Sequence, residues 1–294
     1  MAEASPQVER APPRTAFVLA GGGSLGAIEV GMLQALLEWG EQPAFLVGAS
    51  AGAINAAYFA GDPTREGARE LERIWCALKR SDVLPFNLRS VFGLLRRRGH
   101  LVDASGLRRL LERHLPYRRL EDAALPVHLV ASDMLNGQEV LLSTGAAVDA
   151  VLASAAIPGV YPPVRIGERW LVDGGVTNNT PISAAVGLGA TRVIVLPTGF
   201  ACALERAPSG AIARAMHALS LLVARQLVYD AERFAGTALA LRIVPSLCPL
   251  DVSPYDYTAA ARLIARARTE THRWLERGGL EQAGIPPQLR EHHD

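Results

Sequence analysis

The sequence predicts an α/β fold with a mainly parallel central sheet. Over residues 15–61, two apolar runs that end in small residues alternate with two stretches of helical periodicity. Strands and helices that alternate in this order favour parallel strands joined by right-handed crossovers. The chain has 294 residues, of which 49% are hydrophobic and 20% charged, so it is long enough and apolar enough to bury a sizeable core.

The N-terminal elements follow from where each apolar run stops. A buried strand is expected at residues 15–20, because the run "TAFVLA" ends at three glycines. Apolar residues then recur at helical spacing over 27–39, and Gly40 ends that helix. A second buried strand is expected at 44–50, followed by a helix of small residues at 51–61.

Further along the chain, turn residues mark two β-hairpins. Between residues 63 and 125 the sequence is more polar and predicts helices. The turn Leu135–Gly137 separates runs at 127–132 and 138–144, and its Asn-Gly favours a type I′ turn. A second hairpin is expected at 164–172. Buried strands at 192–198 and 239–244, and helices at 209–235 and 256–277, complete the expected elements.

No shift in composition divides the chain into separate folding units. We expect a disordered tail at residues 1–13, a single domain at 14–285 and a polar C-terminal tail at 286–294. The first residues are polar and rich in proline, and they lack the apolar core of a secretory signal. No uninterrupted apolar run reaches about 18 residues, so we expect no transmembrane helix.

Charge and cysteine content exclude several function classes. A net charge of +1 gives no whole-protein attraction to nucleic acid. The three cysteines are widely spaced, unlike those of zinc sites or disulfide frameworks, and the sequence holds no D-x-D-x-D-G calcium loop. We therefore expect no nucleic-acid partner, no metal and no organic cofactor. The cysteine pattern also favours a reducing compartment, the cytoplasm.

A glycine-rich turn at residues 21–26 fits two kinds of site. Gly21, Gly23 and Gly26 match G-x-G-x-x-G behind a strand, which is typical of dinucleotide-binding turns. A dinucleotide fold ends its second strand with an acidic residue, about 20 residues beyond the glycines. Ser50 stands there instead, which favours an oxyanion hole for acyl transfer over a pyrophosphate site.

Ser50 is the candidate nucleophile. The residues Gly48–Gly52 match G-x-S-x-G where a strand meets a helix, although tight packing alone would also explain five small residues. In a nucleophile elbow the turn strains the serine backbone, the flanking glycines avoid a clash, and the helix N-terminus stabilises a developing alkoxide. The first two strands are expected to be neighbours, so the amides of Gly22 and Gly23 face Ser50, helped by the amide of Ala51.

Asp173 is the candidate base. It follows an apolar strand and precedes Gly174 and Gly175, which allow other groups to approach closely. A lone Asp-Gly-Gly is more often an ordinary turn. One acyl-transfer reaction, however, explains why a glycine turn, a serine elbow and an acid turn occur together. We therefore expect the Asp173 carboxylate to leave a strand end on the same sheet edge as Ser50.

The sequence resembles the patatin-like phospholipase family. The resemblance spans about residues 15 to 200 and rests on four motifs: "GGGSLG" (21–26), "GASAG" (48–52), "ASAAIPGVYPPV" (153–164) and "DGGVTNNTP" (173–181). The combination is far more specific than any one of the motifs. The apolar segment at 153–164 also suits an acyl groove, although core packing explains it nearly as well.

The resemblance implies a three-layer α/β/α domain and a Ser-Asp catalytic dyad without a histidine. Ser50 is then the acylated nucleophile and Asp173 the general base. The expected oxyanion-hole residues are Gly21, Gly22, Gly23, Gly26 and Ala51, with Gly48 and Gly52 as elbow glycines and Gly174 and Gly175 as acid-turn glycines. Family members often carry Lys or Arg where this sequence has Leu25. The sequence therefore does not predict whether this position helps to bind anionic headgroups.

Histidines are a weaker choice for the base. In the ordinary α/β-hydrolase order a histidine follows the acid, and four do so here. They are His217, His272, His292 and His293. His217 belongs to an amphipathic helix and the last two to a polar tail, so we assign structural or surface roles to all four.

The stretch 84–101 fits two interpretations. It mixes large apolar residues with four arginines, a pattern that suits a helix packed on its own domain beside a basic turn. The apolar residues include Phe86, Leu88, Val91, Phe92, Leu94 and Leu95. The same pattern suits peripheral contact with a membrane, apolar groups in the acyl boundary and guanidinium groups on phosphate. We favour packing slightly.

We expect a serine acyl hydrolase that acts on lipid esters, of the phospholipase A, lysophospholipase or esterase type. Acyl transfer to an alcohol or thiol is an alternative on the same residues. A nucleotide-binding regulator that uses the glycine turn is another, and so is a catalytically silent lipid-binding module, which the presence of Ser50 and Asp173 disfavours. The sequence does not predict the oligomeric state.

Overall fold

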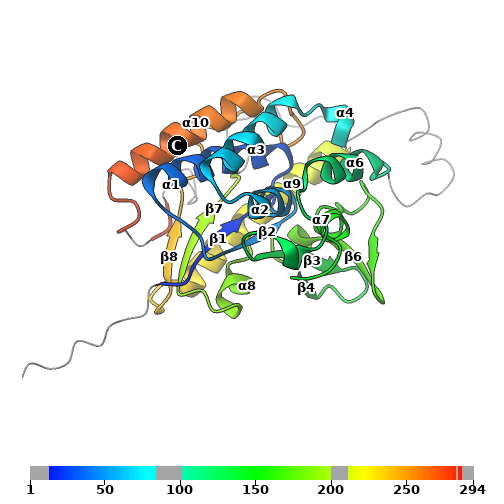
Figure 1. The fold of residues 1–294 in the computed structure, drawn as a ribbon, viewed down its shortest axis with the longest axis horizontal. Helices are drawn as coiled ribbons and strands as arrows, with labels where there is room; N and C mark the ends of the chain where they lie inside the picture. The colour runs from blue at the N-terminus through cyan, green and yellow to red at the C-terminus, as the bar shows by residue number, and fades with distance from the viewer. Residues whose placement is uncertain (1–12, 84–100, 200–210, 283, 287–294) are drawn as a thin grey trace, which may run out of the picture.

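The structure is a computed structural model that describes residues 13–83, 101–199, 211–282 and 284–286. Within these ranges eight strands form one sheet (Figure 1). The strands are β1 (Thr15–Leu19), β2 (Phe45–Ala49), β3 (Val127–Asp133), β4 (Glu139–Leu142), β5 (Val164–Ile166), β6 (Arg169–Asp173), β7 (Arg192–Leu196) and β8 (Ala240–Ile243). Their order is β5-β6-β3-β2-β1-β7-β8, with β4 also paired to β3.

The sheet is mainly parallel, as the sequence predicts. Five strands, β8, β7, β1, β2 and β3, lie side by side in parallel. The two expected hairpins supply the antiparallel part: β4 pairs with β3, and β5 pairs with β6. The expected neighbours β1 and β2 are confirmed as well, with Leu19 opposite Gly48.

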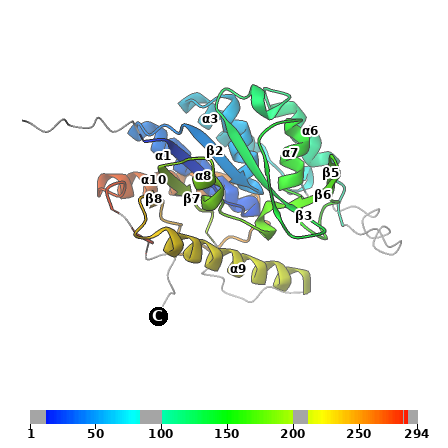
Figure 2. The ribbon, with the colours of Figure 1, turned by 90° about the horizontal axis from the view of Figure 1, so that it is seen from below.

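Helices cover both faces of the sheet, which gives the expected three layers (Figure 2). One face carries α1 (Gly26–Trp39), α2 (Ala51–Gly61), α3 (Arg65–Ala77), α6 (Ser105–His114), α7 (Ala147–Ser154) and α10 (Ala260–Glu276). The other carries α8 (Ile182–Gly187) and α9 (Ala211–Phe234). The remaining short helices are α4 (Arg80–Val83), η1 (Gly23–Leu25), η2 (Leu120–Asp122) and η3 (Gly174–Val176).

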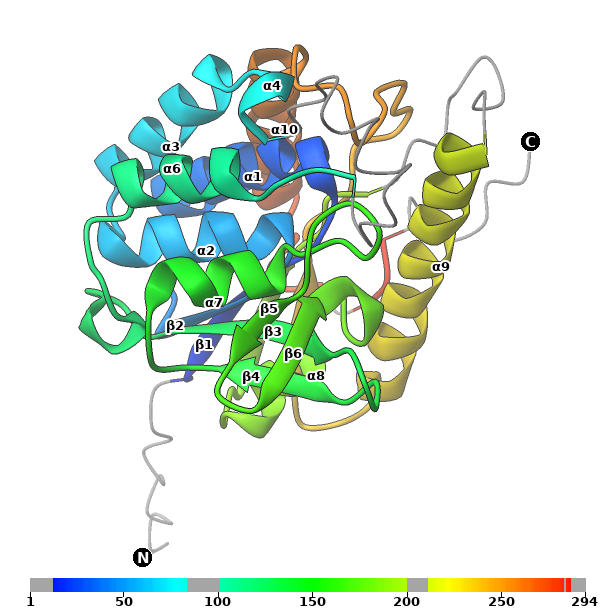
Figure 3. The same ribbon diagram turned by 90° about the vertical axis from the view of Figure 1, so that its right-hand side faces the viewer.

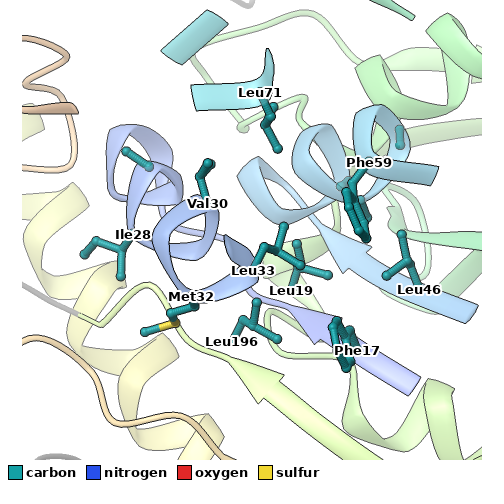
Figure 4. Packing of buried hydrophobic residues seen from close by; sticks show 14 of the residues in the cluster. Phe17, Leu19, Ile28, Val30, Met32, Leu33, Leu46, Phe59, Leu71 and Leu196 are labelled. Atoms are coloured by element: carbon teal, nitrogen blue, oxygen red, sulfur yellow. The ribbon is translucent and has the colours of Figure 1, made fainter. Parts of the chain in front are cut away.

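Alternation along the strands divides the core in two. In β1, Phe17 and Leu19 join the larger core under α1, α2 and α10, whereas Ala16 and Val18 join the smaller core under α8 and α9. Successive side chains of a strand point to opposite faces, so a strand that is apolar throughout is buried on both. Figure 4 shows the larger core, where Leu19 of β1 lies beside Leu33 of α1 and Phe17 belongs to the same cluster.

Two strands, β2 and β6, share one edge of β3. Ala131 pairs with Val140 of β4 and with Asp173 of β6, so β4 and β6 occupy opposite edges of β3. Ala49, at the end of β2, pairs with Val130 on the edge that β6 occupies, because the other edge of this stretch belongs to β4. The strand β2 runs parallel to β3 and β6 runs antiparallel, so their carboxyl ends meet head to head.

The turn of the first hairpin differs from the expected type I′. A type I′ turn needs positive φ at both central residues, and here only Gly137 has one, at 68°. The loop instead spans Met134–Gly137, and the Gly137 amide donates to the Asp133 carbonyl at 2.9 Å. Because Asn136 uses its side chain to accept from the Gln138 amide, it does not need the left-handed conformation.

Several expectations fall outside the described ranges. They include the terminal tails, apart from residues 13 and 286, and all but the last residue of the stretch 84–101. No helix of the described part is both long enough and apolar enough to cross a bilayer.

The C-terminal helix α10 joins the domain through a close backbone approach to α1. An ideal Cβ on Gly31 of α1 would lie 2.2 Å from the carbonyl oxygen of Ile264 and 2.8 Å from the amide nitrogen of Arg268, both in α10. Only a residue without a side chain permits this spacing. Gly31 therefore fixes how closely the two helices pack.

Replacing Gly31 with Ala is expected to push α10 away from α1 and to lower the free energy of unfolding by about 1–3 kcal/mol, the usual cost of overpacking. Gly187→Ala is the matched control, because a Cβ there would meet nothing within 4 Å. In the exposed last turn of α8 the added methyl is expected to stabilise slightly. Urea unfolding of both variants checks this, and equal stabilities would contradict the packing argument.

Candidate active site

Ser50 occupies a strained turn between β2 and α2. Its φ of 53° is the one positive value among the described residues other than glycine. The strained turn is held from outside, because the Ser50 amide lies within hydrogen-bond distance of two oxygens of Ser154, the carbonyl at 3.2 Å and Oγ at 3.1 Å. Ser50 also precedes the first residue of α2, where the helix dipole favours negative charge. The elbow expected from the sequence is present.

The glycines beside Ser50 are required by space. A Cβ on Gly48 would lie 2.5 Å from the Gly52 carbonyl oxygen, and one on Gly52 would lie 2.3 Å from that of Leu19. Backbone atoms cannot move aside as a flexible side chain can. The two glycines therefore let α2 pack directly against the ends of β1 and β2.

Ser50 and Asp173 are in direct contact. The Ser50 hydroxyl donates to Asp173 Oδ2 at 2.7 Å. The contact arises because Ala49 and Asp173 face consecutive residues of β3, Val130 and Ala131. The sequence suggested that both side chains leave one common sheet edge, but the two strand ends approach from opposite directions.

Asp173 is buried, and burial raises its pKa. The side chain is one of the buried polar groups of the protein. Burial raises the pKa of Asp173 from its ordinary 3.8 to about 6, against the hydrogen bonds from Ser50 and from the Gly175 amide, which lower it. That amide donates to Oδ1 at 2.7 Å. A Cβ on Gly174 would lie 2.1 Å from the Val130 carbonyl oxygen, so the close approach expected at the acid turn is also present.

The glycine turn beside Ser50 is held rigidly by residues that sequence reasoning did not single out. The carbonyl of Gly21 accepts from Asn179 Nδ2 at 3.1 Å and from Thr198 Oγ1 at 2.8 Å, and its amide donates to the Asn179 carbonyl at 3.0 Å. Asn179 belongs to the sequence motif that begins at Asp173. Its place in that motif could have indicated that it lies near the site. Thr198 follows β7 and carried no signal.

These contacts show which amides of the expected oxyanion-hole residues are already hydrogen-bonded. The amide of Gly21 is bonded to Asn179, and the amide of Gly26 is bonded within the turn to Gly23 and Ser24. By contrast, the amides of Gly22, Gly23 and Ala51 make no hydrogen bond with the described part of the chain. The set of candidate donors thus narrows to these three.

Two pockets meet at Ser50. The first, which we call the α2–α6 pocket, is lined by residues of α2, α3 and α6, helices whose arrangement Figure 3 shows. Its walls are mostly apolar, with Ile54, Leu71 and Leu111 among them. The second, which we call the Asp173 pocket, is lined by Asp173 and the glycine turn. A carboxylate in the same pocket disfavours the pyrophosphate that the dinucleotide alternative requires.

A buried polar chain, missed by sequence reasoning, links the glycine turn to the α2–α6 pocket. Asn55 Nδ2 donates to the Gly26 carbonyl at 2.9 Å and to Glu29 Oε2 at 2.7 Å, and Trp75 Nε1 donates to Asn55 Oδ1 at 2.8 Å. Glu29 is completely buried, and burial raises its pKa well above the ordinary value. Trp75 lines the pocket and stacks on Tyr257.

None of the four histidines considered from the sequence is placed between Ser50 and Asp173, which touch directly. His272 on α10 bonds to Glu38 at 2.7 Å, and His217 lies on α9. His292 and His293 fall outside the described ranges. Of the described residues that line the two pockets, His114 is the one histidine, and sequence reasoning passed over it because it precedes Asp173.

Comparison with known proteins agrees with the family resemblance of the sequence motifs. A family model described as patatin-like phospholipase matches residues 17–186. An NTE family protein of Mycobacterium tuberculosis (strain CDC 1551 / Oshkosh) is 35% identical over 165 residues, which cover 56% of this chain and 27% of that protein. Patatin-like phospholipase domain-containing protein 7 of Rattus norvegicus is 29% identical over 186 residues, 63% of this chain and 13% of that protein.

The fold is also shared with a solved structure. VipD from Legionella pneumophila superposes with a TM-score of 0.50 at 16% sequence identity, over 91% of this chain and 67% of that chain. The chain spans about a quarter of the mycobacterial relative and a smaller part of the rat protein.

Glu29→Ala is expected to lower the free energy of unfolding by about 2–4 kcal/mol, because it leaves a cavity and removes the acceptor of Asn55. Glu29→Gln keeps the shape and a neutral acceptor, so we expect a change below about 1 kcal/mol. Urea unfolding measures both. Equal losses in the two variants would show that the negative charge, and not the neutral hydrogen-bonding group, is what the fold needs.

Proposed function

The chain belongs to the patatin-like phospholipase family, and on that premise we propose that it is a serine acyl hydrolase that cleaves ester bonds of lipids through Ser50 and Asp173. The observation that carries the proposal is the 2.7 Å hydrogen bond from Ser50 Oγ to Asp173 Oδ2 at the junction of two pockets. A lone carboxylate in water is a poor base toward an alcohol. Burial of Asp173 raises its pKa to about 6 and makes it a better proton acceptor.

Acylation begins when Ser50 Oγ attacks the carbonyl carbon of the ester. Its proton passes to Asp173 Oδ2 as the new oxygen–carbon bond forms, which gives a tetrahedral intermediate. The bond from carbon to the alcohol oxygen then breaks, and the proton on Asp173 passes to that oxygen. The products of this half are the free alcohol and an acyl ester of Ser50.

Deacylation repeats the sequence with water. A water molecule attacks the acyl carbon and gives a proton to Asp173. The bond from this carbon to Ser50 Oγ then breaks, the proton passes from Asp173 to Oγ, and the fatty acid is released. In both halves negative charge develops on the carbonyl oxygen. The amides of Gly22, Gly23 and Ala51 are the candidate donors to it, and each donor of this kind contributes about a hundredfold to a thousandfold in rate.

Ser50→Ala and Asp173→Asn are each expected to lower kcat/KM for ester hydrolysis by at least about 10⁴-fold, because they remove the nucleophile and the base. Fatty-acid release measures the loss, and a fluorophosphonate probe followed by peptide mapping identifies the labelled residue. Ser105→Ala and Asp122→Asn are controls, since both side chains are exposed. Label on another residue, or activity retained in either site variant, would overturn the assignment.

The activity is expected to rise about tenfold per pH unit below about 6 and to level off above it. The sign follows from the role of Asp173: burial raises its pKa to about 6, and only the ionised carboxylate can accept the Ser50 proton. Initial rates of the folded protein between pH 4.5 and 8 check this, with circular dichroism to confirm the fold. A flat profile across pH 5 to 7 would contradict the assignment of the base.

Asp173→Asn is expected to stabilise the fold at neutral pH while it abolishes activity. A raised pKa means that ionised Asp173 costs the folded state free energy, on the order of 3 kcal/mol for a rise from 3.8 to about 6. The cost is absent below pH 3.8, where both states are protonated, and it grows as pH rises to about 6. Unfolding curves of both proteins should diverge over that window, and a less stable variant at pH 7 would contradict the argument.

A further inference from the structure

The two pockets that meet at Ser50 differ in their relation to the base. Asp173 lines the Asp173 pocket together with Val176 and Tyr255, and it is not among the residues of the α2–α6 pocket. Ser50 and Gly23 line both pockets. An ester bonded to Ser50 Oγ therefore has two separate spaces for its two halves.

Proton transfer distinguishes these spaces. The proton removed from Ser50 lies on Asp173 and must reach the oxygen of the leaving alcohol as its bond to the acyl carbon breaks. That oxygen must lie within hydrogen-bond reach of Asp173, and so must the water that attacks later. The alcohol therefore belongs in the Asp173 pocket. The acyl chain is left with the α2–α6 pocket, whose walls are mostly apolar.

The length of the α2–α6 pocket can be read along α2. Ala51, Ile54 and Tyr58 line the pocket, and their spacing of three and four residues places them on one face of the helix. At 1.5 Å per residue, the path from Ser50 to Tyr58 is about 12 Å. An extended alkyl chain advances about 1.3 Å per carbon, given C–C bonds of about 1.5 Å at tetrahedral angles. The row of pocket residues along α2 thus matches the length of about nine or ten carbons.

Polar side chains mark the end of the pocket that is distant from the nucleophile. Tyr58 and His114, at the C-terminal ends of α2 and α6, line this end, and both are partly buried. Burial raises the pKa of Tyr58, and the charge of Glu70 raises it further; burial lowers the pKa of His114, and Glu70 opposes that change. Glu70 thus lies near both rings. It pairs with Arg73, whose side chain is 59% exposed, so solvent reaches the side chains around this end.

We propose that the α2–α6 pocket binds the acyl chain and the Asp173 pocket binds the alcohol, and that binding energy stops increasing at about ten carbons, the length set by α2. The inference rests on the proposed function, since it assigns the two halves of an ester bonded to Ser50. Up to that length each carbon is buried among apolar side chains. Longer chains pass Tyr58 and His114 into water and gain nothing further. The substrates selected are esters of medium-chain fatty acids.

A series of p-nitrophenyl esters with acyl chains of four to about sixteen carbons, kept below their aggregation limits, tests the length. We expect kcat/KM to rise up to about fourfold per added carbon, which corresponds to about 0.8 kcal/mol per buried methylene. The rise should end near ten carbons. A rise that continues to the longest chain, or no dependence on length, would overturn the proposal.

Two tryptophan variants test the division between the pockets. Ile54→Trp fills the α2–α6 pocket one helical turn from Ser50, so decanoate esters should lose at least about tenfold in kcat/KM while butyrate esters are retained. Val176→Trp is the matched variant in the Asp173 pocket, where the valine is 52% exposed and a larger side chain has room. It should weaken hydrolysis of decanoate esters of bulky alcohols relative to methyl decanoate, and it should leave the acyl-length profile unchanged.

Labelling of Ser50 by a small fluorophosphonate separates failure of this inference from failure of the proposed function. If the wild type labels and hydrolyses esters but Ile54→Trp leaves the length profile unchanged, or Val176→Trp shifts it instead, the division of the pockets is wrong and the function stands. If the wild type neither labels nor hydrolyses, both fail together. Thermal unfolding checks the fold of each variant, and Ile54→Phe replaces Ile54→Trp if the latter does not fold.

Discussion

Two strands that run in opposite directions share one edge of β3, and their carboxyl ends meet there. The pairing of Ala49 with Val130 and of Asp173 with Ala131 is made by backbone alone, yet it places a hydroxyl and a carboxylate 2.7 Å apart. The residues around this junction allow the backbones to approach closely. Glycines at 48, 52 and 174 remove the side chains that would hold the backbones apart.

The junction costs folding free energy, which the rest of the fold offsets. A carboxylate at the centre of a domain is unfavourable, and only two hydrogen bonds offset the burial of Asp173. Ser50 adds a backbone conformation that amino acids with a side chain rarely adopt. Large apolar cores on both faces of the sheet hold these two residues in place. The same burial that weakens the fold raises the basicity of Asp173, so stability and reactivity oppose each other at this residue.

Sequence reasoning identified Ser50 and Asp173 because each belongs to a local motif at the end of an apolar run. It could not identify how they meet, since the pairing of β6 with β3 joins residues about 40 positions apart and leaves no local pattern. Glu29 was missed because an acidic residue in a helix usually faces water, and only the tertiary packing of Asn55 shows otherwise. The hydrogen bond from the Gly21 amide to Asn179 was not predicted, because the two residues are distant in sequence.

The antiparallel insertion of β6 also determines where the chain tolerates changes in length. Side chains alternate along a strand, so a single residue inserted within Arg169–Asp173 would turn the carboxylate to the opposite face of the sheet, away from Ser50. The hairpin tip at Gly167 has nothing within 4 Å of where a side chain would begin. Homologous chains can therefore diverge in loop length at that tip, whereas the number of residues between the tip and the acid is fixed by the chemistry.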